Sequence, residues 1–193
     1  IVNELCDGLG IHPVLAKLLV HRGIENFQDA KSFFRPQLKS LHDPFLMKDM
    51  DKAVKRLTNA IQQNEKILVF GDYDVDGATS VAMMYLFLKT LTENLSYYVP
   101  DRYKEGYGIS YDSLDFANDN DFTLIIALDC GTRSVQHIAK AKEMGIDFII
   151  CDHHNPGEEI PDAVALLNPK QKDCTYPFPY LSGAGVGFKF IQG

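Results

Sequence analysis

The residues best suited to chemistry are acids and imidazoles that follow short apolar runs at three places in the chain. The apolar runs cover residues 67–70, 124–128 and 148–151. Carboxylates and imidazoles without thiolates are typical of Mn²⁺ or Mg²⁺ sites and less typical of structural zinc sites. Enough ligands are present for two ions, and a pair of ions is the usual clamp for phosphoryl displacement. These residues are Asp72, Asp74, Asp76, Asp129, Asp152, His153 and His154.

Parallel strands are the elements that must bring these side chains together. From residue 66 onward, apolar runs alternate with helical patterns, and near-continuous apolar strands predict an α/β fold, a parallel sheet with helices on both faces. The carboxyl ends of parallel strands meet at one edge, so distant acids converge there. Crowded carboxylates repel one another, and divalent cations remove that repulsion. The expected strands are 67–70, 96–99, 124–128, 148–151 and 163–167, and the expected helices are 78–91, 111–118 and 134–144.

The residues before the first strand predict a small helical lead-in, so we divide the chain into residues 1–65 and an α/β domain over 66–193. Helical patterns cover 12–22, 26–34 and 49–64. Either Asp49 or Asp51 can cap the last of these helices. The chain lacks an initial Met and stops inside a helical pattern, and we therefore expect a piece of a longer protein whose domain is truncated at its C-terminal end.

Composition favours a soluble protein of the cytoplasm. The chain has 193 residues, of which 46% are hydrophobic, and no apolar stretch approaches the ~20 residues that span a bilayer. Its four cysteines have no C-x-x-C spacing, which fits a reducing compartment. The net charge of −7 argues mildly against a nucleic-acid partner, but that objection weakens if the acids bind cations.

The acidic loop 71–77 has three competing interpretations. An EF-hand calcium loop would need a glutamate where Met83 stands, and a helix before it. The nucleophile loop of haloacid-dehalogenase-type phosphatases would use Asp74 as the phosphorylated residue, but has no use for His153 and His154. Simple capping of the next helix needs one acid, and leaves Asp129 unexplained.

Two further segments carry both a functional and a structural interpretation. The loop after residue 100 offers Arg102 to phosphates and Tyr107 to a base, or its glycines only permit a turn. The helix start at Gly183 and Gly185 differs in spacing from a dinucleotide fingerprint. It is expected to accept a phosphate, with close helix packing as the alternative.

The same motifs resemble those of the DHH phosphoesterase superfamily, and within it most closely the RecJ family of bacterial exonucleases. The resemblance covers nearly the whole chain, including the helical lead-in. It includes Arg22-Gly23-Ile24, Phe34-x-Pro36, Leu41-His42-Asp43-Pro44, the loop Gly71–Gly77, Pro100-Asp101-Arg102, Glu105-Gly106-Tyr107-Gly108, Asp152-His153-His154 and the stretch Leu181–Lys189.

The resemblance implies a role for each site residue. His154 would contact the substrate phosphate, while Asp72 and Asp152 would support the catalytic groups. RecJ-like proteins carry a further metal-ligating Asp downstream of the stretch 182–189, and this chain ends before it. We therefore expect a fragment with weak or no activity and with one of its two ions weakly held. The implied ligands of Mn²⁺ or Mg²⁺ are Asp74, Asp76, Asp129 and His153.

The implied function is metal-dependent 5′→3′ hydrolysis of single-stranded DNA, with release of 5′-mononucleotides during DNA repair and recombination. The expected partner is single-stranded DNA, together with a single-strand-binding protein or a helicase for the longer protein, and no membrane. Two other classes stay open. One is a phosphodiesterase for short oligonucleotides or cyclic dinucleotides, and the other is a catalytically inactive RecJ-like replication scaffold.

Overall fold

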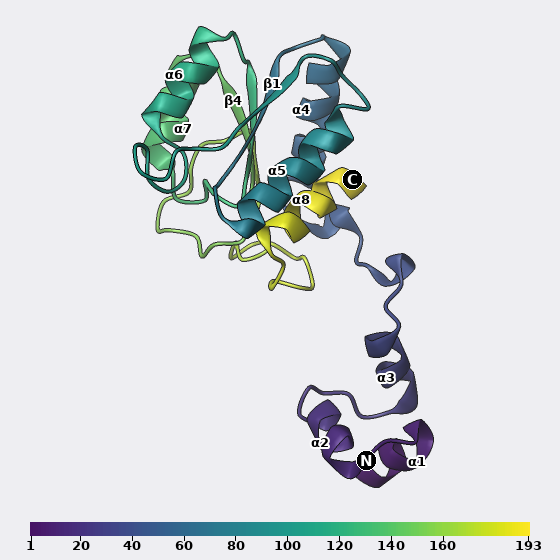
Figure 1. Cartoon of the computed structure of the whole chain (residues 1–193). Coiled ribbons are helices and arrows are strands. Elements are labelled where there is room, and N and C mark those ends of the chain that lie inside the picture. Colours follow the sequence, from purple (N-terminus) through teal and green to yellow (C-terminus); the bar gives the residue numbers. More distant parts are fainter. The chain divides into compact units, whose positions relative to one another are not determined.

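The computed structural model describes all 193 residues, whose contacts divide them into two compact units, Ile1–His42 and Asp43–Gly193 (Figure 1). The first unit contains α1 (Val2–Leu9), α2 (Pro13–Val20), α3 (Phe27–Phe34) and the short 3-10 helix η1 (Leu38–Ser40). Its small core is formed by Leu5, Ala16, Leu19, Ile24 and Ala30.

Local sequence explains the helices of this first unit. Pro13 stands in the first turn of α2, where a missing N–H costs nothing. The Asn26 side chain accepts a hydrogen bond from the Asp29 amide (2.9 Å) and so caps α3. The structure confirms the helices expected over 12–22 and 26–34, but α1 was not expected. No helix of the chain combines the length and the hydrophobicity needed to cross a bilayer.

The second unit is built on one parallel sheet of five strands in the order β2-β1-β3-β4-β5. All four strand pairs are parallel. This architecture confirms the α/β class predicted from the sequence. The strands are β1 (Ile67–Gly71), β2 (Leu95–Tyr98), β3 (Leu124–Leu128), β4 (Asp147–Cys151) and β5 (Ala165–Leu167).

Helices cover both faces of the sheet, as expected (Figure 1). Alternate strand residues point to opposite faces. Val69 and Ile126 join the core beneath the first group of helices, whereas Leu68 and Ile125 join the core beneath the second group. The first group is η2 (Pro44–Leu46), α4 (Met50–Gln62), α5 (Val75–Leu88) and α8 (Gly183–Gln192), and the second is α6 (Tyr111–Asp119) and α7 (Val135–Glu143).

Helix α4 packs with the sheet and lies in the second unit. Its buried residues Met50, Ala53, Leu57 and Ala60 belong to the same core as β1 and β5. The contact boundary lies at 42/43, before the boundary expected at 65/66, because the apolar face of α4 packs into the core of the sheet unit. Neither acid caps α4 as proposed, since Asp49 occupies the N-cap position without a side-chain cap hydrogen bond.

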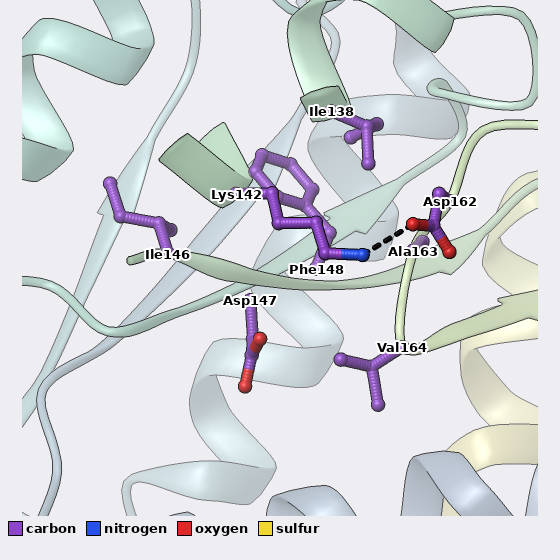
Figure 2. A pocket seen from close by; sticks show the side chains of 8 residues that line it. All are labelled: Ile138, Lys142, Ile146, Asp147, Phe148, Asp162, Ala163 and Val164. Atoms are coloured by element: carbon purple, nitrogen blue, oxygen red, sulfur yellow. Dashed lines mark hydrogen bonds and ion pairs between the residues drawn. The ribbon is translucent and has the colours of Figure 1, made fainter. Parts of the chain in front are cut away.

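A small cavity of about 110 Å³ lies at the amino ends of β4 and β5 (Figure 2). Lys142 and Asp162 form an ion pair across it, and the side chains of Ile138 and Phe148 line its wall. None of the acids or imidazoles singled out by the sequence lines this cavity. The candidate chemistry therefore lies at the opposite, carboxyl edge of the sheet.

The packing of α4 predicts that Met50 stabilises the sheet unit. Met50→Ala removes a fully buried side chain, and we expect the free energy of unfolding of this unit to fall by about 2–5 kcal/mol. Lys55→Ala, at an exposed position of the same helix, should change it by less than about 0.5 kcal/mol. Chemical denaturation followed by circular dichroism measures both values. An unchanged main transition for Met50→Ala would place α4 outside the cooperative unit.

Candidate metal centre

The first strand of the site, β1, ends in a loop whose acids also begin a helix. Helix α5 begins at Val75, three residues earlier than expected, which makes Asp74 its N-cap and places Asp76 in its first turn. The Asp74 carboxylate accepts a hydrogen bond from the Gly77 amide at 2.8 Å. A Cβ on Gly77 would lie 2.7 Å from the carbonyl carbon of Asp72, so only glycine permits this tight turn.

Asp129, directly after β3, is the most strained and least satisfied acid of the site. Its backbone adopts the left-handed conformation with φ 61°, a region unusual for residues with a side chain. The side chain is 2% exposed, its Oδ1 makes no hydrogen bond, and Nε2 of His153 lies 3.1 Å from that oxygen. Burial, together with the charges of Asp76 and Asp74, raises the pKa of Asp129 to about 7.

Asp72 is the second acid with an unsatisfied buried oxygen. Its Oδ1 accepts a hydrogen bond from the Tyr73 amide at 2.7 Å, whereas its Oδ2 has no partner. Burial raises the pKa of Asp72 above its ordinary value, and the charge of Asp74 adds to that shift. An unpaired buried carboxylate oxygen is costly, and a nearby cation would relieve that cost.

Asp152, directly after β4, is by contrast fully satisfied. Its Oδ2 accepts from the Thr132 amide (2.9 Å), and its Oδ1 contacts the amides of His153 (2.7 Å) and His154 (3.2 Å) and the Nδ1 of His154 (2.7 Å). Burial would raise the pKa of Asp152, but the hydrogen bonds from Thr132 and His154 outweigh it and lower that pKa. Asp152 therefore fixes the ring of His154, leaving Nε2 to face the site.

Asp76 binds the N-terminus of α8. Its two oxygens accept hydrogen bonds from the amides of Gly183 and Ala184, both at 2.8 Å, and Nε2 of His153 lies 3.8 Å away. The Gly185 amide donates to the Ser182 side chain at 3.1 Å. The amides of Gly183 and Gly185, expected to receive a phosphate, therefore already have acceptors within the protein.

The geometry brings three of the predicted residues into one possible metal-binding group. Asp129, His153 and His154 each offer a ligand atom, and these atoms lie within 4.8 Å of one another. The orphaned Oδ1 of Asp129 faces this group, so the donors present fit a divalent cation that accepts oxygen and imidazole nitrogen. His154 enters the group although the sequence assigned it only to phosphate, because Asp152 holds its other ring nitrogen.

A chain of aromatic and cationic contacts leads from the loop after β2 to the imidazoles. The Arg102 guanidinium lies 5.3 Å from the centroid of the Tyr73 ring, which meets the Tyr107 ring edge-on at 6.5 Å. The Tyr107 hydroxyl lies 3.3 Å from Nε2 of His154 and donates to the Asp129 carbonyl at 3.4 Å. Arg102 and Tyr107 thus adjoin the site as predicted residues, whereas Tyr73 was missed, although it stands between two of the predicted acids.

Comparison with known proteins agrees with this geometry. The family model for the N-terminal domain of the DHH family matches residues 66–193. The chain belongs to the DHH family. This membership confirms the resemblance inferred from Asp152-His153-His154, and it replaces the EF-hand and haloacid-dehalogenase alternatives.

Relatives within the DHH family are RecJ proteins. The chain is 45% identical over 191 residues to the single-stranded-DNA-specific exonuclease RecJ of Bacillus subtilis, covering 99% of this chain and 24% of that protein. A crystal structure of exonuclease RecJ bound to manganese matches with a TM-score of 0.66 and 30% identity, over 75% of this chain and 37% of the other. RecJ from Thermus thermophilus in complex with Mn²⁺ matches with a TM-score of 0.76 and 26% identity, over 98% of this chain and 26% of the other. The chain spans about a quarter of the length of the Bacillus relative.

The raised pKa of Asp129 predicts that metal binding depends on pH. Below about pH 7 this carboxyl group carries a proton, which an incoming cation must displace. We expect the affinity for Mn²⁺ to rise about tenfold per pH unit up to about pH 7 and to level off above it. Calorimetry in two buffers of different ionisation enthalpy measures the proton release. Asp129→Asn should reduce that release, and an affinity independent of pH would contradict the assignment.

The close approach of α8 to Asp129 predicts that Gly183 is required for metal binding. A Cβ on Gly183 would lie 2.6 Å from Cβ of Asp129, so Gly183→Ala must displace that carboxylate. We expect the Mn²⁺ affinity to fall at least tenfold in calorimetry, the scale of losses at groups that position metal ligands. Gly185→Ala is the matched control on the same helix, since its Cβ would contact Leu181 at 3.3 Å and the Ser182 hydroxyl at 3.6 Å and would not meet Asp129. Equal affinity in both variants would show that the approach does not matter.

Proposed function

We propose that this chain carries the metal-binding part of a single-stranded-DNA-specific exonuclease that hydrolyses phosphodiester bonds from the 5′ end and releases 5′-mononucleotides. The observation that carries the proposal is the buried Asp129 carboxylate with an unbonded oxygen beside His153 and His154. The RecJ name of the Bacillus relative, at 45% identity, supplies the substrate class. DNA repair and recombination are the expected processes.

The proposed cofactor is Mn²⁺ or Mg²⁺, since related RecJ structures are described with these ions. Asp129 and His153 would hold an ion together with Asp74 and Asp76. Bound divalent ions act as Lewis acids and lower the pKa of water, which makes hydrolysis feasible near neutral pH. The complete enzyme is expected to use two ions.

The surrounding residues would orient the substrate around these ligands. Asp152 accepts from Nδ1 of His154 and directs Nε2 toward the site, where the protonated ring would donate to a phosphoryl oxygen and offset the negative charge that builds up during hydrolysis. Asp72 supports the loop of Asp74 through its bond to the Tyr73 amide. Arg102 supplies positive charge for a neighbouring phosphate, and Tyr107 offers a ring beside it.

The expected partner is single-stranded DNA, and the cytoplasm is the expected location. A single-strand-binding protein or a helicase remains the proposed protein partner of the longer protein. Two alternatives remain. One is a phosphodiesterase for short oligonucleotides or cyclic dinucleotides, and the other is an inactive replication scaffold. The test below gives a different result for each of them.

The decisive test uses the longer parent protein, Mn²⁺ and single-stranded DNA labelled at either end. We expect mononucleotides from the 5′ end, and we expect Asp129→Ala and His153→Ala to lower the rate by more than about 100-fold, because each removes a metal ligand. Asp162→Ala is the matched control, since this acid pairs with Lys142 at the opposite edge of the sheet.

Each alternative predicts a different result. Digestion that begins at the 3′ end, or that needs no metal, would contradict the proposal. Hydrolysis restricted to short oligonucleotides or cyclic dinucleotides would favour the phosphodiesterase alternative. Tight binding of Mn²⁺ and DNA without any hydrolysis would favour the scaffold.

A further inference from the structure

A second cavity, of about 500 Å³, opens at the carboxyl edge of the sheet directly beside His154. Its walls come from three segments, the loop before α6, the turn between β3 and α7, and the turn after β4. Ile109 and Cys130 connect it to the core beneath α6 and α7. The residues that the following argument uses are Tyr107, Ile109, Thr132, Arg133, His137 and His154.

The lining differs in chemistry from the acidic centre next to it. Tyr107 and His137 contribute rings, and Ile109 contributes an apolar surface. Asp152 is the one carboxylate of the lining. It is already hydrogen-bonded to the backbone amides of Thr132 and His153 and to Nδ1 of His154. Arg133 lies at the rim, where its Nε donates to the Asn155 carbonyl at 2.8 Å. A concave site with rings and few free polar groups suits an aromatic ligand.

Two buried polar residues, Thr132 in the lining and Asn168 beneath it, are occupied by hydrogen bonds to each other and to neighbouring residues. The Thr132 amide donates to Asp152, and its hydroxyl oxygen accepts from the Asn168 side chain at 3.0 Å. Asn168 also donates to the His154 carbonyl at 2.8 Å. Because these groups are already hydrogen-bonded, they are not free to form hydrogen bonds with the edge of a base. The rings of Tyr107 and His137, in contrast, can stack on any base.

The cavity and the metal centre share Tyr107 and His154, so one nucleotide can occupy both places. Its phosphate would lie at His154, and its sugar would carry the base into the cavity. The volume falls within the range of about 300–1,000 Å³ typical of small-ligand sites.

We infer that this cavity binds the base of a nucleotide adjoining the scissile phosphate, and that it requires a base without distinguishing its identity. The inference rests on the proposed exonuclease function and adds a nucleobase subsite to it. Burial lowers the pKa of His137, which keeps its ring neutral and suited to stacking at neutral pH.

The test uses the full-length parent protein with Mn²⁺ and oligonucleotides that carry a single abasic residue at the first or the second position. At one of these positions we expect the wild-type protein to cleave the abasic substrate about tenfold more slowly than the normal substrate. This factor lies at the lower end of the losses expected when one stacked base is removed. Exchange of the base at that position should change the rate by less than about threefold.

His137→Ala should reduce the discrimination against the abasic substrate from about tenfold to about twofold, while the rate on the abasic substrate itself stays unchanged. That unchanged rate also shows that the variant is folded. Gln136→Ala is the matched control, at the neighbouring exposed position of α7, and should retain the full discrimination. Equal rates on normal and abasic substrates, or equal discrimination in His137→Ala and wild type, would overturn the inference.

If the wild-type protein hydrolyses neither substrate, the proposed function is refuted. The nucleobase subsite is then tested by binding measurements alone. Calorimetry with Mn²⁺ then compares thymidine 5′-monophosphate with deoxyribose 5-phosphate. We expect the nucleotide to bind about tenfold more tightly to wild type and no more than about twofold more tightly to His137→Ala. Equal binding of the two ligands to wild type would refute the subsite independently of catalysis.

Discussion

The crowding of five carboxylates at one edge of a parallel sheet is the constraint on which the site depends. Parallel strands place their carboxyl ends side by side, so acids from distant parts of the chain meet. Backbone amides donate hydrogen bonds to four of them: the Tyr73 amide to Asp72, the start of α5 to Asp74, the start of α8 to Asp76, and the turn after β3 to Asp152. The buried oxygens without a hydrogen bond, Oδ2 of Asp72 and Oδ1 of Asp129, are the ones that a cation would satisfy.

Two glycines make this arrangement sterically possible. Gly77 lets the first turn of α5 lie against the backbone of Asp72, and Gly183 lets α8 approach Asp129. Asp76 bridges these helices across 107 residues of sequence through its bond to the Gly183 amide. The candidate metal centre is therefore supported by packing between α5, α8 and the strand ends, and a change at either glycine would displace candidate ligands without removing one.

The sequence predicted the sheet well because its strands are buried on both faces. A short, continuous apolar run between turn residues, such as 124–128, is typical of a strand buried on both faces. Strand β3 covers those same residues. The start of α5 was placed three residues too late, since Asp74 and Asp76 were assigned to a loop although acids also begin helices. The position of α4 was not predictable from its own pattern, because an apolar helix face does not specify which core it joins.

The convergence of Asp129, His153 and His154 followed from topology, but the partner of each acid did not. A helix start rich in glycine predicts an anion, and both a phosphate and a carboxylate satisfy that prediction. In this protein the carboxylate of Asp76 takes the place at α8. Under the proposed function, a substrate phosphate would therefore find its compensating charge at Arg102, at His154 and at the proposed cation. This arrangement would keep the substrate away from the N-terminus of α8, which already binds Asp76.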